Sequence, residues 1–92
     1  MKVHDGRAQC PCCDYFTLNE RGGYEVCPIC YWEDDGQDLD DLDTVSGPNH
    51  LTLRAARQNF VRFGASDQAA VGLVATEAER DGVRREQRAT YF

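Results

Sequence analysis

Two Cys-Pro-x-Cys segments constrain this 92-residue chain more than any other feature of its sequence. The first is CPCC at 10–13, and the second, CPIC at 27–30, follows after thirteen intervening residues. A Cys-x-x-Cys loop turns two thiolates toward one ion, and the proline after the first cysteine fixes φ and preorganises the loop. Two such loops supply four sulfur ligands, so we predict one tetrahedral metal site, with zinc as the ion. The predicted ligands are Cys10, Cys13, Cys27 and Cys30.

The predicted site is closed. Four cysteines leave no coordination position for water, which is typical of a structural rather than a catalytic metal. The sequence shows no readable Ser/His/Asp or Cys/His arrangement and no Gly-rich phosphate loop, so we expect a protein that is not an enzyme. Structural zinc contributes about 10–16 kcal/mol in zinc-finger peptides, more than the whole stability of a small domain. We therefore expect the fold to depend on the metal. A rubredoxin-like iron electron carrier with the same four thiolates is the alternative.

A fifth cysteine, Cys12, leaves the choice of ligands in the first loop open. Cys10 and Cys13 have the spacing of the second loop, which favours them. We interpret Cys12 as a small packing residue beside the site, and the other interpretation is a redox-sensitive thiol. Two histidines are further potential ligands. We expect His4 in a mobile N-terminus and His50 as a cap or surface residue before a helix, because four cysteines already complete a tetrahedral site.

The charge balance is acidic. Lys and Arg total 10 against 16 Asp and Glu, for a formal net charge of -6. Such a surface repels phosphate backbones, so a nucleic-acid-binding zinc ribbon is a further alternative that the charge opposes. No apolar run approaches the ~20 residues that span a bilayer, and the first ten residues lack the apolar part of a secretory signal. We therefore expect no membrane association and a cytoplasmic protein, where paired thiols favour metal over disulfides.

The composition predicts one small α+β domain over residues 1–92, in three parts. Residues 1–32 hold every cysteine and form the metal-binding part. Residues 33–50 are acidic, and we expect a loop. Residues 51–92 have helical patterns, and their end is expected to fray. A domain of this size buries a limited core, for which a bound metal compensates.

A β-hairpin between the two cysteine loops is the predicted centre of the first part. Residues 15–18 are aromatic and β-branched, as in a short strand, and residues 24–26 provide its partner. Residues 19–23 contain two glycines that suit a turn. Such a hairpin, with a cysteine pair at each open end, is zinc-ribbon-like.

A first helix is predicted after the acidic part. Four apolar side chains recur at steps of three and four, which places them on one helical face. These are Leu53, Ala56, Phe60 and Phe63. Asn49 or Thr52 is the expected N-cap, and Gly64 the residue that ends the helix.

One or two further helices are expected. One begins at Ser66 or Asp67 and packs through three apolar side chains, which are Ala70, Val71 and Val74. Another begins at Thr76, which forms a capping box with Glu79. This last helix carries mixed charges, and we expect it to be exposed. Its basic residues are Arg80, Arg84, Arg85 and Arg88.

The segment from Trp32 to Gly36 begins the acidic part. We expect Trp32 to pack under the first helix while a neighbouring carboxylate, such as Glu33, pairs with Arg54 or Arg57. Asp34 to Asp43 is expected to be a solvated face, because like charges this dense rarely pack. A calcium or magnesium site and a partner-docking loop are the alternatives, although the spacing does not fit an EF-hand.

Three segments together resemble a known family. They are CPCCDYFTL, YEVCPICYWEDDGQ and NHLTLRAARQNFVRFGAS, which cover about residues 8–66 in this order. They resemble the bacterial cysteine-rich family named for its Cys-Pro-Cys-Cys motif. The resemblance implies a small zinc-ribbon or rubredoxin-like module and no particular activity. The family usually has Gly after the motif, whereas this chain has Asp14 there and Tyr31 after the second loop. A positive φ would strain Tyr31, so we expect the two loops to differ.

These observations favour one function. We expect a non-enzymatic zinc-binding module whose closed metal site supports a surface for a protein partner of unidentified nature. The acidic segment is the candidate for that surface.

Overall fold

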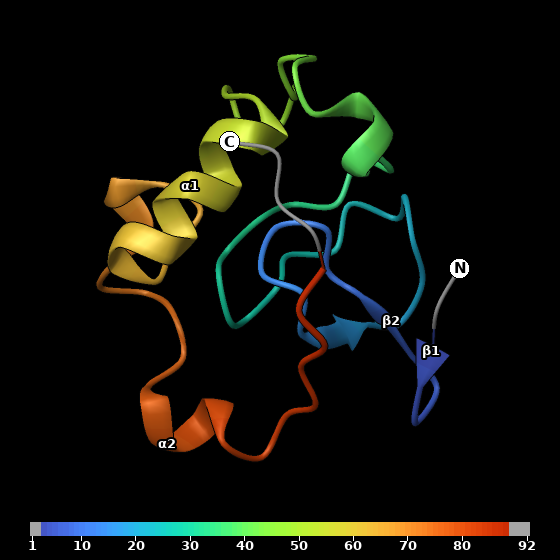
Figure 1. Cartoon of the computed structure of the whole chain (residues 1–92), viewed down its shortest axis with the longest axis vertical. Helices are drawn as coiled ribbons and strands as arrows, with labels where there is room; N and C mark the ends of the chain where they lie inside the picture. The colour runs from blue at the N-terminus through green and yellow to red at the C-terminus, as the bar shows by residue number, and fades with distance from the viewer. Residues whose placement is uncertain (1–2, 89–92) are drawn as a thin grey trace.

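A three-stranded antiparallel sheet begins the fold in the computed structural model, which describes residues 3–88. Its strands are β1 (Val3–His4), β2 (Arg7–Gln9) and β3 (Phe16–Leu18), in the order β1-β2-β3. Figure 1 shows the sheet on one side of the cysteine loops and helix α1 on the other. None of the helices in residues 3–88 is long and apolar enough to cross a membrane.

The predicted hairpin between the two cysteine loops was wrong. Each loop is itself the turn of a hairpin, because Gln9 pairs with Phe16 across the first loop and Val26 with Glu33 across the second. Strand β3 therefore pairs with β2 and not with residues 24–26. The turn residues were compatible with the predicted hairpin, but strands of three residues carry too little pattern to identify their partners.

Helix α1 spans Leu53–Phe63 and matches its prediction. The side chain of Thr52 accepts a hydrogen bond from the backbone N–H of Ala55, so Thr52 is the N-cap. Gly64 ends the helix with a φ of 80°, a left-handed conformation that Gly adopts without a Cβ clash. The face with Leu53 and Ala56 is buried, and it packs on the cysteine loops.

The elements after α1 are shorter than predicted. The expected helix from Ser66 or Asp67 is one 3-10 turn, η2 (Gln68–Ala70), after which Val71 is exposed. Helix α2 covers only Glu77–Arg80, although it has the predicted capping box of Thr76 and Glu79. The predicted frayed end, where it involves residues 89–92, lies outside the described residues.

Residues 84–88 form an extended segment, the strap, which lies against the first cysteine loop. The backbone N–H of Phe16 donates to the carbonyl of Arg84 at 2.9 Å, and Arg85 pairs with Tyr15 in antiparallel fashion. Figure 1 shows the red end of the chain beside the blue loop. A helix through Arg84, Arg85 and Arg88 was therefore a wrong prediction, because hydrogen bonds to a distant segment take the place of helical ones.

The acidic part contains a buried carboxylate that the sequence did not indicate. Arg21 donates to both oxygens of Asp34, at 2.9 and 3.1 Å, and the N–H of Gly22 donates to one of them at 2.7 Å. Asp34 is fully buried, so its place in a solvated face was wrong. The prediction holds farther along, where Asp40 and Asp41 are exposed beside the 3-10 turn η1 (Leu39–Asp41).

The core of the described residues is built around the cysteines. Trp32 is its largest side chain and is fully buried, as predicted. It lies in one cluster with Leu18, Ile29, Leu53 and the five cysteines. Burying such side chains contributes about 1.5–3 kcal/mol each, which is little in total for a chain of this length. The two cysteine loops therefore form part of the core of the domain.

Candidate metal centre

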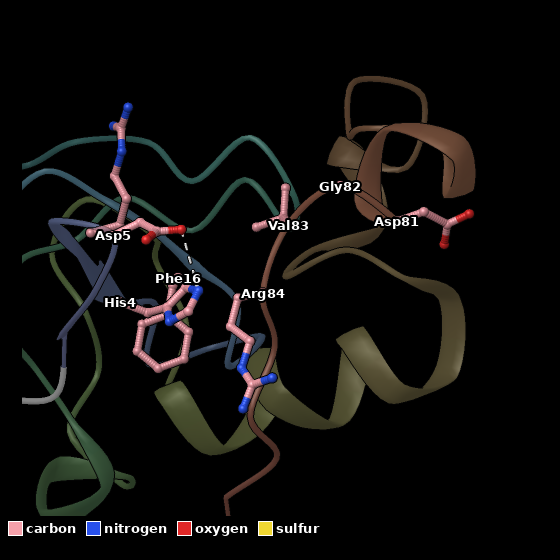
Figure 2. Close-up of a pocket in the computed structure, with 8 residues that line it drawn as sticks. His4, Asp5, Phe16, Asp81, Gly82, Val83 and Arg84 are labelled. Atoms are coloured by element: carbon pink, nitrogen blue, oxygen red, sulfur yellow. Dashed lines mark ion pairs between the residues drawn. The ribbon is translucent and has the colours of Figure 1, made fainter.

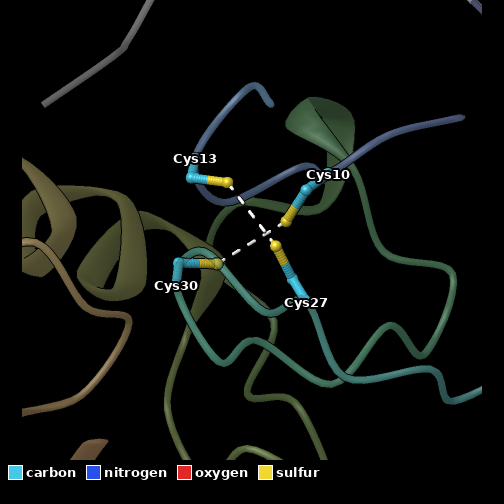
Figure 3. A group of neighbouring side chains, drawn as sticks. All are labelled: Cys10, Cys13, Cys27 and Cys30. Atoms are coloured by element: carbon cyan, nitrogen blue, oxygen red, sulfur yellow. Dashed lines mark hydrogen bonds between the residues drawn. The ribbon is translucent and has the colours of Figure 1, made fainter. Parts of the chain in front are cut away.

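The four predicted sulfur ligands converge on one point. All four Sγ atoms lie within 4.8 Å of one another, and Figure 3 shows them directed toward a common centre. The Sγ atoms of Cys10 and Cys30 are 3.7 Å apart, as are those of Cys13 and Cys27. A tetrahedral ion with bonds of ~2.3 Å would place its sulfurs about 3.8 Å apart, whereas a disulfide needs about 2.05 Å. The donor set therefore fits a single tetrahedral metal ion.

The two cysteine loops are structural copies of each other, offset by seventeen positions. In each loop the N–H of the first cysteine donates to the carbonyl five residues later, and its carbonyl accepts from the N–H four residues later. The bonds are Cys10 N to Tyr15 O at 2.8 Å, Asp14 N to Cys10 O at 3.0 Å, Cys27 N to Trp32 O at 2.9 Å and Tyr31 N to Cys27 O at 2.8 Å. Both loops therefore present their thiols in the same way.

The residue after each loop adopts a positive φ, 69° for Asp14 and 70° for Tyr31. The expectation that Tyr31 would make the loops differ was wrong. A left-handed conformation costs an L residue about 1–2 kcal/mol, and aspartate tolerates it better than tyrosine. The hydrogen bonds of the loop impose the conformation in both cases.

Cys12 occupies the position that Ile29 has in the second loop. Both side chains are buried, with 2% and 1% exposed. The group of four sulfurs that could share an ion does not include Cys12. Its correspondence to an isoleucine supports the interpretation of Cys12 as a packing residue.

Burial raises the pKa of three of the four thiols, and hydrogen bonds outweigh it at the fourth, Cys27. Burial raises the pKa of Cys13 and Cys30 well above the ordinary value of 9.0, because a thiolate is poorly solvated in the interior. Burial also opposes ionisation of Cys27. Hydrogen bonds from Cys10 and the other thiols, and from the Thr17 hydroxyl at 3.1 Å, nevertheless hold the Cys27 pKa well below that value.

Asp14 anchors the first loop through a buried ion pair. Arg57 from α1 donates to its two oxygens at 2.8 and 3.1 Å, and Arg88 from the strap donates through Nε at 2.9 Å. Burial would raise the pKa of Asp14, but the hydrogen bonds from Arg57 and Arg88 lower it. Arg57 also donates to the carbonyl of Pro11 at 2.6 Å.

The predicted pairing of the arginines of α1 with the segment after Trp32 was wrong. Arg57 pairs with Asp14, and Arg54 pairs with the exposed Asp43 at 2.7 Å. The backbone of Glu33 is instead held by the side chain of Asn49, which accepts from its N–H at 2.9 Å and donates to its carbonyl at 2.8 Å. Asn49 therefore does not cap the helix but fixes the second loop.

Distant segments also cap the carbonyl groups of both loops. On the first loop, Arg88 donates to the carbonyl of Cys10 at 3.1 Å and Arg85 to that of Cys13 at 3.0 Å. The second loop receives three such bonds, namely Ser66 N to Cys30 O at 2.8 Å, Ala75 N to Pro28 O at 2.9 Å and Arg80 Nη2 to Ile29 O at 3.2 Å. These contacts could not be predicted from the sequence, because each joins residues far apart in the chain.

The two histidines lie apart from the sulfurs. His4 is in β1 and pairs with Asp5 at 3.3 Å. Figure 2 shows both in a hollow of about 440 Å³ whose opposite wall is residues 81–84. His50 is exposed, as predicted. Within residues 3–88, no other group of three or more Cys, His, Asp or Glu side chains lies close enough to share an ion.

The fold and the four sulfurs define a small cysteine-rich α+β module with a site suited to a metal ion. The chain belongs to the family described as Cysteine-rich CPCC, which matches residues 8–81. This confirms the resemblance seen in the sequence, and the strap lies beyond the matched range. No curated protein and no solved structure gave a significant match.

Proposed function

We propose that the chain is a zinc-binding module in which the metal has a structural role and supports a surface for a protein partner. The observation that carries this proposal is the convergence of four buried sulfurs at distances that fit one tetrahedral ion. Zinc suits such a site because it prefers four tetrahedral ligands and accepts thiolates readily.

The surroundings of the sulfurs support a structural role. All four cysteines are fully buried or nearly so, and backbone groups of both loops are capped by other parts of the chain. Four protein ligands leave no position for a substrate or a reacting water, so the module is not an enzyme at this site. A bound ion would hold the two loops together at the centre of a small core.

Elemental analysis of the purified full-length protein tests this proposal. We expect one zinc ion per chain and a colourless solution. A red protein with visible absorption bands and one iron per chain would instead support a rubredoxin-like electron carrier. A protein that folds with less than a tenth of an equivalent of any metal would contradict both functions.

A further inference from the structure

Asp14 and Tyr31 occupy equivalent positions in the two loops but use their side chains in opposite ways. The Asp14 side chain is 1% exposed and is held by Arg57 and Arg88. Tyr31 is 39% exposed, and among residues 3–88 its ring forms no hydrogen bond or ring contact. The loop hydrogen bonds account for the positive φ of both residues, so the two positions differ in what surrounds their side chains.

Tyr31 lines a groove of about 330 Å³ between the second cysteine loop and the segment after α1. Val26, Tyr31 and Glu33 form one wall, and Asp67 and Leu73 belong to the other. The apolar side chains among them, Val26, Tyr31 and Leu73, are exposed. Exposed apolar side chains gathered in a groove are typical of a site that binds another molecule.

The wall at the second loop corresponds to the surface that the strap covers on the first loop. The offset of seventeen relates Val26, Tyr31 and Glu33 to Gln9, Asp14 and Phe16. The strap forms hydrogen bonds with each of these three residues: Gln9 Nε2 donates to Glu86 O at 2.7 Å, Glu86 N to Asp14 O at 3.3 Å and Phe16 N to Arg84 O at 2.9 Å. The groove is therefore the place where an equivalent strap would lie on the second loop.

Among residues 3–88, only part of this second surface has a hydrogen-bonding partner. Asn49 takes the position of Arg84, because its side chain bonds to the N–H and the carbonyl of Glu33. The carbonyl of Tyr31, the equivalent of the Asp14 carbonyl, has no hydrogen-bond partner in the part of the chain that the structure describes. An extended segment that enters from the Tyr31 end would find an acceptor and an apolar wall.

The charges of the groove are acidic. Glu33 and Asp67 are its charged lining residues, and between residues 3 and 88 neither forms an ion pair with a basic side chain. The chain as a whole is also acidic, with a formal net charge of -6. A segment that combines apolar side chains with lysine or arginine therefore complements both the surface and the charge.

We propose that this groove binds an extended segment of a partner protein. Its apolar side chains pack against Val26, Tyr31 and Leu73, and a lysine or arginine lies beside Glu33 or Asp67. The binding mode is edge pairing, as the strap pairs with the first loop, with the carbonyl of Tyr31 as an acceptor. This inference rests on the proposed function, because it locates the partner surface of the zinc module.

Two capped heptapeptides test the proposal with the zinc-loaded full-length chain. One alternates valine and lysine, and the other alternates valine and glutamate. Fluorescence anisotropy measures affinity, and amide chemical shifts locate the bound peptide. We expect the valine-lysine peptide to bind and to shift the amides of Val26, Tyr31 and Leu73. No binding of this peptide at millimolar concentration, equal binding of the glutamate peptide, or shifts confined to another surface would overturn the proposal.

Tyr31→Asn is the decisive variant, and Tyr24→Asn is its matched control. Both tyrosines are exposed and have a positive φ, which asparagine tolerates, but only Tyr31 lines the groove. We expect both variants to fold with one zinc, and Tyr31→Asn alone to weaken peptide binding about tenfold or more, as loss of an aromatic anchor does. Unchanged affinity of Tyr31→Asn contradicts the proposed groove.

A second pair of variants tests the charge. Glu33→Gln with Asp67→Asn removes two charges from the groove, and Asp40→Asn with Asp41→Asn removes two from an exposed turn elsewhere. The first pair should weaken binding of the valine-lysine peptide more than the second, and equal effects would show non-specific attraction and overturn the proposal. Metal content is measured on the same samples. A chain without zinc contradicts the proposed function, whereas a zinc-loaded chain that does not bind the peptide contradicts this inference.

Discussion

The guanidinium group of Arg57 donates to both carboxylate oxygens of Asp14, at 2.8 and 3.1 Å. Forty-three residues separate the two in sequence, and both are almost fully buried. The pair joins helix α1 to the first cysteine loop at the position where Asp14 has a positive φ. It therefore holds a strained residue beside the sulfur site.

Replacing Arg57 by alanine should destabilise the protein strongly. The change leaves Asp14 buried without its main partner, and breaking a buried pair in this way costs about 3–5 kcal/mol. Arg54→Ala on the same helix is the control, because its pair with Asp43 is exposed and should contribute little. Urea unfolding of the metal-loaded proteins measures both effects. A loss of stability for Arg57→Ala no greater than that for Arg54→Ala would contradict the role assigned to the pair.

Valine substitutions at two adjacent cysteines should have opposite effects on metal binding. Cys13→Val removes a sulfur from the group of four, so we expect no tightly bound metal and loss of the cooperative fold. Cys12→Val replaces a packing side chain at the position where the second loop has Ile29, so one ion per chain should remain. Metal content after gel filtration decides the matter. Loss of the ion in Cys12→Val would show that the ligand set is wrongly assigned.

A side chain at Gly64, the residue that ends helix α1, should destabilise the protein. Gly64 has a φ of 80°, and an added Cβ would lie 3.3 Å from the guanidinium of Arg80. Gly64→Ala should therefore lower the free energy of unfolding by about 1–2 kcal/mol, which is the cost of a left-handed residue with a Cβ. Gly47→Ala is the control, since a Cβ there has open space and no positive φ is involved. Equal thermal midpoints for the two variants would contradict this assignment.

The stability of the second cysteine loop should depend on the side-chain amide of Asn49. Asn49 accepts from the N–H of Glu33, donates to its carbonyl and donates to the hydroxyl of Ser46 at 2.8 Å. Asn49→Ala leaves these partly buried groups without partners, at a cost of about 1–3 kcal/mol. Asn49→Asp retains the acceptor but places a carboxylate oxygen against the carbonyl of Glu33, so it should not restore the stability lost in the alanine variant. An alanine variant as stable as the original protein would show that water replaces the amide.

Features set by neighbouring residues could be predicted from the sequence. The spacing of the cysteines was sufficient to indicate which sulfurs converge, and Thr52 and Gly64 marked the ends of α1. The capping box of Thr76 and Glu79 was likewise visible, because its hydrogen bonds join residues three apart. At Thr52, Gly64 and the capping box one local interaction fixes the structure, whereas the cysteines could be assigned because the two loops repeat the same spacing.

Features set by distant contacts could not be predicted. The helical pattern beyond Arg80 gave no sign that the strap pairs with the first loop and ends α2 early. Asp34 lies in a dense acidic run, and its burial depends on Arg21, the nearby basic residue in the preceding turn. The sequence also placed Asp14 and Tyr31 at equivalent positions, but the positive φ that the two residues share comes from backbone hydrogen bonds that it did not indicate.

Removal of the metal tests the central claim most directly. The full-length protein is treated with a strong zinc chelator, and complete removal is verified by elemental analysis. We expect the dispersed amide spectrum and the emission of buried Trp32 to change to those of an unfolded chain, and one equivalent of zinc to restore both. An unchanged, dispersed amide spectrum after complete metal removal would contradict a fold that depends on the four-cysteine site.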